Sequence, residues 1–541
     1  MNRFFRLVLL MLIVTFVIPG IASATTYYIA ANGNDSNNGT SETAAWLHAP
    51  GMKTCSSICA SANPQPGDQF IFRGGDTWTS SSFPWAWDWS GSSGNPITLG
   101  VDQTWFSGSS WTRPIFTGGG TFPGSSAAFF LNVSSGVTYL TVANLGFTGA
   151  YWSGSAAASG ILGYIYLGLG SNPSNILIHD NYFHGWSHAP GVVEDNNTTA
   201  IFCNSTHYDL TAQIYNNAID GSDTTEDSFQ GIYGYGCGTI YQNYIAYVVS
   251  GVNGGFATMH DNTFFHVGLA DYSGGGSHNN EFISNTDAPN GSVVYNNLFE
   301  SAGTETTAGG VGIWLAPLRG TTSYAFNNVI VDQMPIPNST ICSYNLNGQS
   351  SGGNCIYFNN TVECGPDTGA DGPPSWNCMR MDGQSGNGFP GGGQVINNHW
   401  VSSYTSSGGT SINVDSGCNC APTQNPSPQI SQTQAAASAQ GYNFSQAFAF
   451  SPTASSNVSV GAGLNESGLC TTITGVNAAA GTACQSDTTY GVTYDTATHA
   501  VAGLARTPAA RPSSGAWDVG AYQFANGGQP SAPTGLSAVV N

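Results

Sequence analysis

The feature that most constrains this chain is a short pattern that recurs eight times and always contains an asparagine. An apolar or aromatic residue stands three places before the asparagine, and a second one follows it by two places. Successive asparagines are 36, 26, 19, 35, 31, 32 and 38 residues apart. The eight are Asn181, Asn217, Asn243, Asn262, Asn297, Asn328, Asn360 and Asn398, and we place a degenerate earlier copy at Asn144. Constant local chemistry at varying intervals indicates a structural repeat with loops of variable length.

The two apolar positions cannot face one interior along a straight strand, because the side chains of a strand alternate between its faces. The chain therefore has to bend at the asparagine. Strand, polar corner and strand, stacked coil on coil, predict a solenoid whose parallel strands lie about 4.8 Å apart. A second kind of strand precedes the corners, and it contains a Gly or Ala followed directly by an Ile or Val. Its instances are Ala200-Ile201, Gly231-Ile232, Gly251-Val252 and Gly312-Ile313.

Composition agrees with a polar, uncharged β protein and excludes coiled coils, helical bundles and charged disordered tails. Of 541 residues, 71 are glycine, only 7% are charged, and Lys53 is the single lysine. Met1 to Ala24 reads as a secretory signal, with Arg3 and Arg6 ahead of an apolar run. Beyond it the chain carries 7 basic and 30 acidic residues, a formal charge of −23. Neither nucleic acid nor an anionic membrane surface suits such a charge, and we expect a secreted or cell-surface monomer that is not inserted in a membrane after signal cleavage.

The 12 cysteines suit an oxidising compartment and fall into near neighbours along the chain. We expect local disulfides rather than a metal site, since no C-x-x-C pair is present. Cys418 and Cys420 are too close for an easy mutual bridge and could pair elsewhere. The six neighbouring pairs are Cys55/Cys59, Cys203/Cys237, Cys342/Cys355, Cys364/Cys378, Cys418/Cys420 and Cys470/Cys484.

The repeat and the two ends of the chain carry a family resemblance. The asparagine corners look like the coils of the right-handed parallel β-helix of pectate-lyase-like extracellular proteins. Residues 26–40 and 66–75 are similar to the opening segment of that superfamily, and residues 515–522 resemble the terminal strand of β-helix proteins of the choice-of-anchor type. The resemblance implies an all-β, right-handed parallel β-helix with an N-terminal cap and a C-terminal segment packed along the barrel. It does not fix the reaction, because the superfamily includes lyases, hydrolases, epimerases and non-catalytic surface proteins.

We divide the chain accordingly into five parts. After the signal of residues 1–24, residues 25–125 form the opening strand, cap and first coils, and residues 126–405 form the main coils. Residues 406–524 form late coils and the C-terminal segment. Residues 525–541 look like a linker, and an anchor or partner module could be missing beyond them.

Carboxylates gather just ahead of several Gly-Ile strands, and stacking would bring them to one flank. Two carboxylates about 5 to 9.5 Å apart suit glycoside hydrolysis, one protonated and one ionised. Any one of them could equally be a solvated surface residue. The candidate acid and base residues are Glu194, Asp195, Glu226, Asp227 and Asp271.

Aromatic residues at outward positions near these strands are candidates for binding sugars, whose apolar faces suit flat rings. The other explanation is that a loop covers them. The candidate substrate-binding residues are Tyr233, Tyr235, Trp314, Tyr272 and His278, with Trp152 and Trp186 on nearby loops. A second aromatic column stands two places before each corner asparagine, and we expect it to pack beneath the C-terminal segment. It holds His179, Tyr215, Tyr241, His260, Tyr295, Phe326 and Phe358.

These residues favour a carbohydrate-active protein that cleaves a polysaccharide as a glycosidase, without a cofactor. A calcium ion in the Asn32 to Glu42 loop is an alternative. Two other functions stay open. One is a non-catalytic, adhesin-like solenoid that binds glycans. The other is a polysaccharide lyase using an arginine base, for which Arg319 is placed better than Arg113 or Arg380.

Overall fold

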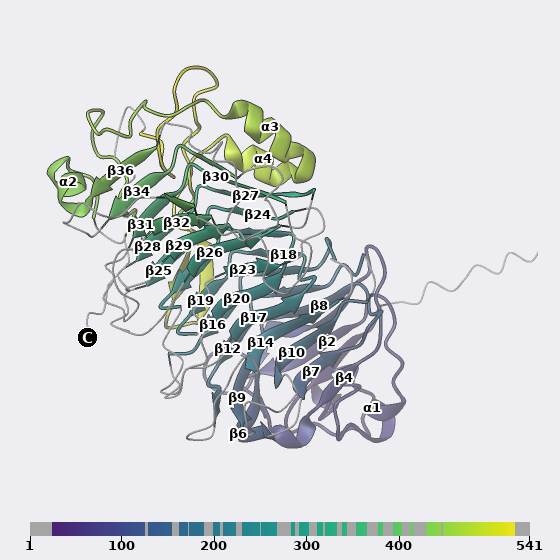
Figure 1. Cartoon of the computed structure of the whole chain (residues 1–541). Helices are drawn as coiled ribbons and strands as arrows, with labels where there is room; N and C mark the ends of the chain where they lie inside the picture. The colour runs from purple at the N-terminus through teal and green to yellow at the C-terminus, as the bar shows by residue number, and fades with distance from the viewer. Residues whose placement is uncertain are drawn as a thin grey trace, which may run out of the picture.

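The computed structural model describes residues 24–124, 128–153, 162–170, 173–188, 198–205, 209–222, 230–248, 250–267, 283–286, 291–301, 311–317, 320–332, 338–342, 353–364, 377–381, 393–402, 412–414, 429–444 and 447–524. Three long sheets of parallel strands run the length of the molecule (Figure 1). Each coil passes through sheet A, then sheet C, then sheet B. The chain therefore folds as the right-handed parallel β-helix that the sequence predicts.

Sheets A, B and C contain 12, 11 and 13 strands among the described residues. Sheet A consists of β1 (Thr26–Ile29), β2 (Gln69–Gly74), β5 (Ile97–Phe106), β8 (Leu140–Ala143), β11 (Leu177–His179), β15 (Gln213–Tyr215), β18 (Thr239–Tyr241), β21 (Thr258–His260), β24 (Val293–Tyr295), β27 (Thr322–Phe326), β30 (Asn354–Phe358) and β33 (Gln394–Ile396). Sheet B consists of β4 (Trp85–Trp87), β7 (Phe129–Val133), β10 (Leu162–Gly168), β14 (Thr198–Asn204), β17 (Gln230–Tyr235), β20 (Ser250–Gly255), β23 (Ile283–Thr286), β26 (Val311–Ala316), β29 (Asn338–Cys342), β32 (Asn377–Met381) and β35 (Ile412–Val414). Sheet C consists of β3 (Thr77–Trp78), β6 (Ile115–Gly124), β9 (Gly146–Trp152), β12 (Tyr182–His184), β13 (Ser187–His188), β16 (Ala218–Asp220), β19 (Tyr244–Ala246), β22 (Thr263–Phe265), β25 (Leu298–Ser301), β28 (Val329–Asp332), β31 (Thr361–Cys364), β34 (His399–Ser402) and β36 (Ile430–Thr433).

The corner between sheets A and C is built by the eight asparagines, each at most 1% exposed. The residue before each asparagine has a φ between 51° and 58°, a left-handed conformation that turns the chain. Asn217 shows the bonding. Its Oδ1 accepts from the backbone N–H and the Nδ2 of Asn181, and its own Nδ2 donates to Ile178 O and Asn243 Oδ1 at 2.9 and 3.0 Å. The same exchange continues without a break to Asn398.

Asn144 is not an earlier member of this ladder, so that expectation was wrong. Strand β8 pairs with β11 so that Ala143 lies beside His179. Asn144 therefore occupies the left-handed position of Asp180, with φ 60°. The ladder position belongs to Leu145, whose backbone N–H donates to Asn181 Oδ1 at 3.0 Å.

The interior of the coils is filled by the two apolar positions of the pattern and by the Gly-Ile strands. Ile214, Ile219 and Ile232 represent the three sheets, and each is fully buried in one continuous core. Four of the predicted disulfides form, Cys55–Cys59, Cys203–Cys237, Cys342–Cys355 and Cys470–Cys484. The sulfur atoms of the other four cysteines lie outside the part of the chain that the structure describes.

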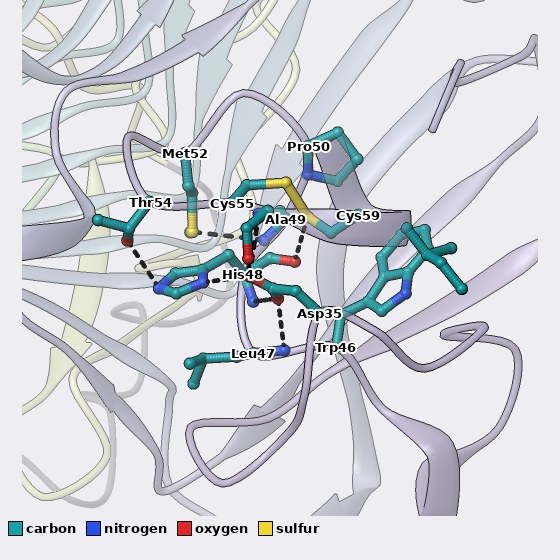
Figure 2. Close-up of a disulfide and its surroundings, with 12 residues drawn as sticks. Asp35, Trp46, Leu47, His48, Ala49, Pro50, Met52, Thr54, Cys55 and Cys59 are labelled. Carbon is teal, nitrogen blue, oxygen red and sulfur yellow. Dashed lines mark hydrogen bonds and ion pairs between the residues drawn. A yellow bond between two sulfur atoms is a disulfide. The ribbon is translucent and has the colours of Figure 1, made fainter. Parts of the chain in front are cut away.

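The N-terminal cap closes the first coils around a buried carboxylate (Figure 2). Asp35 Oδ1 accepts from the backbone N–H groups of Leu47 and His48 at 3.0 and 2.9 Å. Asp35 Oδ2 lies 2.8 Å from His48 Nδ1, and His48 Nε2 lies 2.9 Å from Thr54 Oγ1. The Cys55–Cys59 disulfide sits beside this network at helix α1 (Ser57–Ser61). The network fixes the cap over the open end of the solenoid.

The C-terminal segment covers two of the three outer faces. Helices α3 (Ser467–Val476) and α4 (Ala478–Cys484) pack with Trp517 on the late strands of sheet A (Figure 1). The antiparallel strands β37 (Val492–Asp495) and β38 (Ala500–Leu504) form a two-stranded sheet of their own, which packs on sheet C through Tyr494, stacked on Tyr244 at 4.2 Å. Helix α2 (Gln434–Ala439) follows β36. None of the helices in the described residues has the length and apolarity needed to cross a bilayer.

The asparagine ladder yields a first prediction, for the substitution Asn243→Ala. It removes the acceptor of two donors on Asn217 and leaves buried polar groups unpaired. We expect a loss of about 3 kcal/mol in the free energy of unfolding, measured by denaturant titration. Asn253→Ala, at a half-exposed position on sheet B, is the control and should change it by less than about 0.5 kcal/mol. Equal effects would contradict a structural role for the ladder.

The covered face of sheet C yields a second prediction, from Glu300 on β25. Burial raises the pKa of the Glu300 carboxyl to about 7. Because this pKa is raised on folding, the associated stability is complete below the unfolded value near 4.5 and is lost as pH rises through 7. Glu300→Gln should remove that loss, which amounts to as much as about 3 kcal/mol. Unfolding curves between pH 4 and 8 test this, with the exposed Glu42→Gln as control. Parallel pH dependence of Glu300→Gln and the parent chain would refute it.

Candidate functional site

The outer face of sheet B presents a file of side chains that is set by strand register. Strands β10, β14 and β17 place Tyr166, Phe202 and Tyr233 side by side. Strand β20 continues the file with Asn253, the backbone of Ser284 on β23 takes the next register position, and β26 adds Trp314. The residues between them, such as Ile201 and Ile232, point inward and are fully buried. Sheet B therefore carries one aromatic file with a polar interruption of two coils.

The three aromatic rings before the interruption are tilted against one another. Phe202 lies 5.7 Å from Tyr166 at 36° and 5.4 Å from Tyr233 at 41° between ring centroids and planes. The Asn204 amide donates to the Tyr166 hydroxyl. All three rings are half-buried. Phe129 of β7 also stacks on Phe202 at 5.9 Å and 18° and lies tilted against Tyr166 at 5.3 Å, so part of the Phe202 face is used within the protein.

Of the predicted sugar-binding residues, the structure brings Tyr233, Tyr235 and Trp314 to this face. Tyr235 lies at the end of β17 and is 41% exposed. Trp314 is half-buried, and its indole N–H is shielded from solvent and meets no acceptor among the described residues. Tyr233 and Trp314 are three strands apart, which corresponds to about 14 Å. Tyr272 and His278 lie outside the described residues.

Two other aromatic residues that the sequence suggested for sugar binding are part of the core. Trp152 ends strand β9 and is fully buried, and Trp186 is 2% exposed. That expectation was wrong, because Trp152 ends a strand with its side chain buried and the loop that holds Trp186 folds against the interior. Conversely, the sequence analysis missed Tyr166 and Phe202. The signal was present, since each follows an inward isoleucine in the way that Tyr233 follows Ile232.

The predicted acid and base residues Glu194, Asp195, Glu226, Asp227 and Asp271, together with Arg319, all lie outside the described residues. The strands that follow two of these segments are described. Thr199 of β14 pairs with Gln230 of β17, so the chain enters two adjacent strands at the same edge of sheet B. The Cys203–Cys237 disulfide ties the far ends of the same two coils together.

The aromatic column on sheet A is a weaker candidate. Its rings stack from His179 to Phe358 at centroid distances of 4.7 to 5.1 Å, with interplanar angles of at most 29°. Because each ring face contacts the next ring of the column, these faces are not available to a sugar. The second half, from Tyr295 onward, packs beneath α3, α4 and Trp517 as predicted. The first half, from His179 to His260, is only half-buried, so the predicted cover extends over part of the column.

The histidines of this column belong to the repeat. His179 Nδ1 lies 2.6 Å from Asp180 Oδ2, and His260 Nδ1 lies 2.7 Å from Asp261 Oδ2. Each ring also stacks on the ring of the following coil. Corner geometry accounts for both residues.

In the Asn32 to Glu42 loop, for which calcium was an alternative, the carboxylate of Asp35 belongs to the hydrogen-bond network of the cap. Both carboxylate oxygens of Asp35 already face hydrogen-bond donors of the protein. The partial positive charge on these donors would repel a calcium ion placed at the same oxygens. Among the described residues there is also no group of three or more His, Cys, Asp and Glu side chains able to hold a metal.

Comparisons with known proteins give structural likeness at low sequence identity. No protein-family model matches the chain, and no curated protein matches its sequence. A lacto-N-biosidase of Eubacterium ramulus is 12% identical, with 76% of this chain and 68% of that one covered at a TM-score of 0.42. A pectate lyase is 15% identical, with 93% and 97% covered at a TM-score of 0.37. A rhamnogalacturonan lyase is 13% identical, with 75% and 89% covered at a TM-score of 0.38.

The half-covered column on sheet A yields a third prediction. Phe326→Ala removes a fully buried ring beneath α3 and α4 and should cost about 3 to 5 kcal/mol of unfolding free energy. Tyr215→Ala removes a half-exposed ring of the same stack and should cost about 1 to 2 kcal/mol. Thermal and denaturant unfolding of both variants measure the difference. A loss at Tyr215 as large as that at Phe326 would show that the column is covered along its whole length.

Proposed function

We propose that this chain is an exported protein that binds a polysaccharide along the outer face of sheet B and cleaves it as a glycosidase. The aromatic file of Tyr166, Phe202, Tyr233 and Trp314 carries the proposal. Flat rings bind the apolar faces of sugars, and rings on successive coils suit successive units of an extended chain. The disulfides support export, because such bonds persist in oxidising compartments.

The chemistry of the cleavage is assigned to the carboxylates that precede the strands of sheet B. Glu194 and Asp195 lead into β14, and Glu226 and Asp227 lead into the adjacent β17. Asp271 precedes β23. Adjacent coils are about 4.8 Å apart and alternate coils about twice that. Carboxyl groups on adjacent coils suit a retaining glycosidase, in which one group is the nucleophile and the other the acid. Carboxyl groups on alternate coils suit an inverting glycosidase, in which one group is the base and the other the acid on opposite sides of the bond.

The charge of the chain supports a neutral substrate. Beyond the signal segment there are seven basic residues against 30 acidic ones. Arg73 forms a salt bridge with Asp76, and Arg506 pairs with Asp487 at 2.8 Å. Arg511 is buried, with its guanidinium donating to Asn327 Oδ1 at 2.8 Å. Few cations are left to bind the carboxylates of a polyuronate, which the overall negative charge also repels.

The test of the proposal is a screen of the purified chain against xyloglucan, galactomannan, arabinogalactan and polygalacturonate. We expect new reducing ends from a neutral polysaccharide. Replacing the acid or base, through Glu194→Gln, Asp195→Asn, Glu226→Gln, Asp227→Asn or Asp271→Asn, should lower kcat at least about 100-fold for the residues in those roles. Tyr233→Ala should weaken binding about tenfold while the fold is kept.

The exposed Asp102→Asn is the matched control and should leave kcat unchanged. Products that absorb in the near ultraviolet and disappear with Arg319→Gln would identify a lyase instead. Binding without any released product would identify a non-catalytic, adhesin-like solenoid. Either result contradicts glycosidase action.

A further inference from the structure

The N-terminal cap contains a hydrogen-bonded line of three side chains that the proposed function does not use. Asp35 Oδ2 lies 2.8 Å from His48 Nδ1, and His48 Nε2 lies 2.9 Å from Thr54 Oγ1. Figure 2 shows the carboxylate and the hydroxyl on opposite sides of the imidazole. A carboxylate, an imidazole and a hydroxyl in this order are the parts of a nucleophilic acyl-transfer site.

The contacts of the Asp35 carboxylate determine which nitrogen of His48 carries the ring proton. The carboxylate also accepts from the backbone N–H groups of Leu47, His48 and Ser56 at 2.9 to 3.2 Å. It therefore acts as an acceptor throughout, and the His48 Nδ1 that faces it carries the ring proton. Nε2 is then unprotonated and accepts the hydrogen of the Thr54 hydroxyl. This is the form in which an imidazole can act as a general base toward a hydroxyl.

Burial explains the first two side chains of the line but not the third. The side chains of Asp35 and His48 are 6% and 11% exposed, so their polar atoms need partners within the protein. Thr54 is exposed, and its hydroxyl can bond to water instead. The backbone N–H of Thr54 also donates to no acceptor among the described residues. The line therefore ends in a hydroxyl that a solute can reach.

The backbone that carries Thr54 is held on both sides. The N–H of Lys53 donates to Ser82 O at 3.1 Å. On the other side, Cys55 is bonded to Cys59 of α1. A nucleophile and its base react efficiently only when their relative positions are fixed in this way.

We propose that Thr54 is a nucleophile and His48 its general base, in a site on the cap that hydrolyses small acyl esters. Asp35 is a positioning residue that orients the imidazole and stabilises the imidazolium when it forms. The Thr54 N–H is a donor available to the oxyanion. Because Thr54 is exposed, the site suits a small acyl group on a large alcohol that stays in solvent, such as an acetylated polysaccharide.

The reaction needs water and no other reagent. Thr54 Oγ1 bonds to the acyl carbon as its proton passes to His48 Nε2, and this proton goes to the departing alcohol when the ester C–O bond breaks. Water then attacks the acyl-threonine and gives a proton to His48. The carboxylic acid leaves as Thr54 Oγ1 regains that proton.

The test uses two probes on the purified chain, p-nitrophenyl acetate and a fluorophosphonate that labels activated hydroxyls with loss of fluoride. We expect repeated turnover of the ester and a phosphonate on Thr54, located by mass spectrometry. Acetylation of the exposed Lys53 amine stops after one event, so repeated turnover distinguishes the two.

Three variants separate catalysis from structure. Thr54→Val keeps the shape of the side chain without the hydroxyl, and should lower kcat/KM at least about 100-fold and abolish the label. Thr54→Ser restores a hydroxyl and should keep the label and kcat/KM within about tenfold of the parent chain. Thr43→Val is the matched control, because it removes an exposed hydroxyl of the same cap that contacts Ser41 Oγ and no histidine. It should leave the label and kcat/KM unchanged.

Unchanged kcat/KM in Thr54→Val, or a fluorophosphonate that does not label Thr54, would overturn the inference. A lower unfolding midpoint in Thr54→Val with unchanged kcat/KM would assign Thr54 a purely structural role. Absence of turnover by the parent chain would overturn it as well. The inference goes beyond the proposed function, and since the cap residues take no part in cleavage on sheet B, the ester assay and the polysaccharide screen fail independently.

Discussion

The buried amide of the corner asparagine is the interaction on which the rest of the structure depends. Each amide offers two donors and one acceptor oxygen, and the ladder uses all of them between neighbouring coils. From Asn181 to Asn398, the bonds fix the corner of each coil directly above the corner of the one before. A slip by one residue would leave these buried groups unpaired and would turn every side chain to the opposite face. The ladder therefore sets the register of all three sheets.

Once the register is fixed, each outward position becomes a file along the solenoid, and the three faces are used differently. The C-terminal segment packs on outward residues of sheets A and C, through Trp517 and Tyr490 among others. Among the described residues, its packing clusters include no outward residue of sheet B. A file on that face can therefore vary between aromatic and polar residues without disturbing the packing of the segment. The outward residues of sheet B are therefore the ones least constrained by the packing of the C-terminal segment.

The sequence predicted the parts of the fold that repeat. The asparagine spacing and the Gly-Ile strands predicted the coils, and cysteines close in sequence predicted local bridges such as Cys203–Cys237. The errors concern residues whose environment is set by contacts that the pattern does not encode. Asn144 has the right residue type but stands one place early in register, and Trp186 lies in a loop that folds inward. The candidate acid and base residues stay predictions, because they belong to segments between the repeating strands.

Three arginine side chains help to hold the C-terminal segment on the coils of this strongly acidic protein. Arg113 donates to Thr498 O at 2.6 Å and to Asp180 O, joining the segment to an early coil. Arg506 donates to Thr488 O, and Arg511 bridges Asn327 to Gly520 O. Three of the seven basic residues therefore join or brace the segment by hydrogen bonds to uncharged oxygens. Salt screens little the buried contacts of Arg511 and the partly buried contact of Arg506. Attachment by buried cations leaves the outer surface almost purely acidic, and a neutral polysaccharide is the polymer that such a surface does not repel.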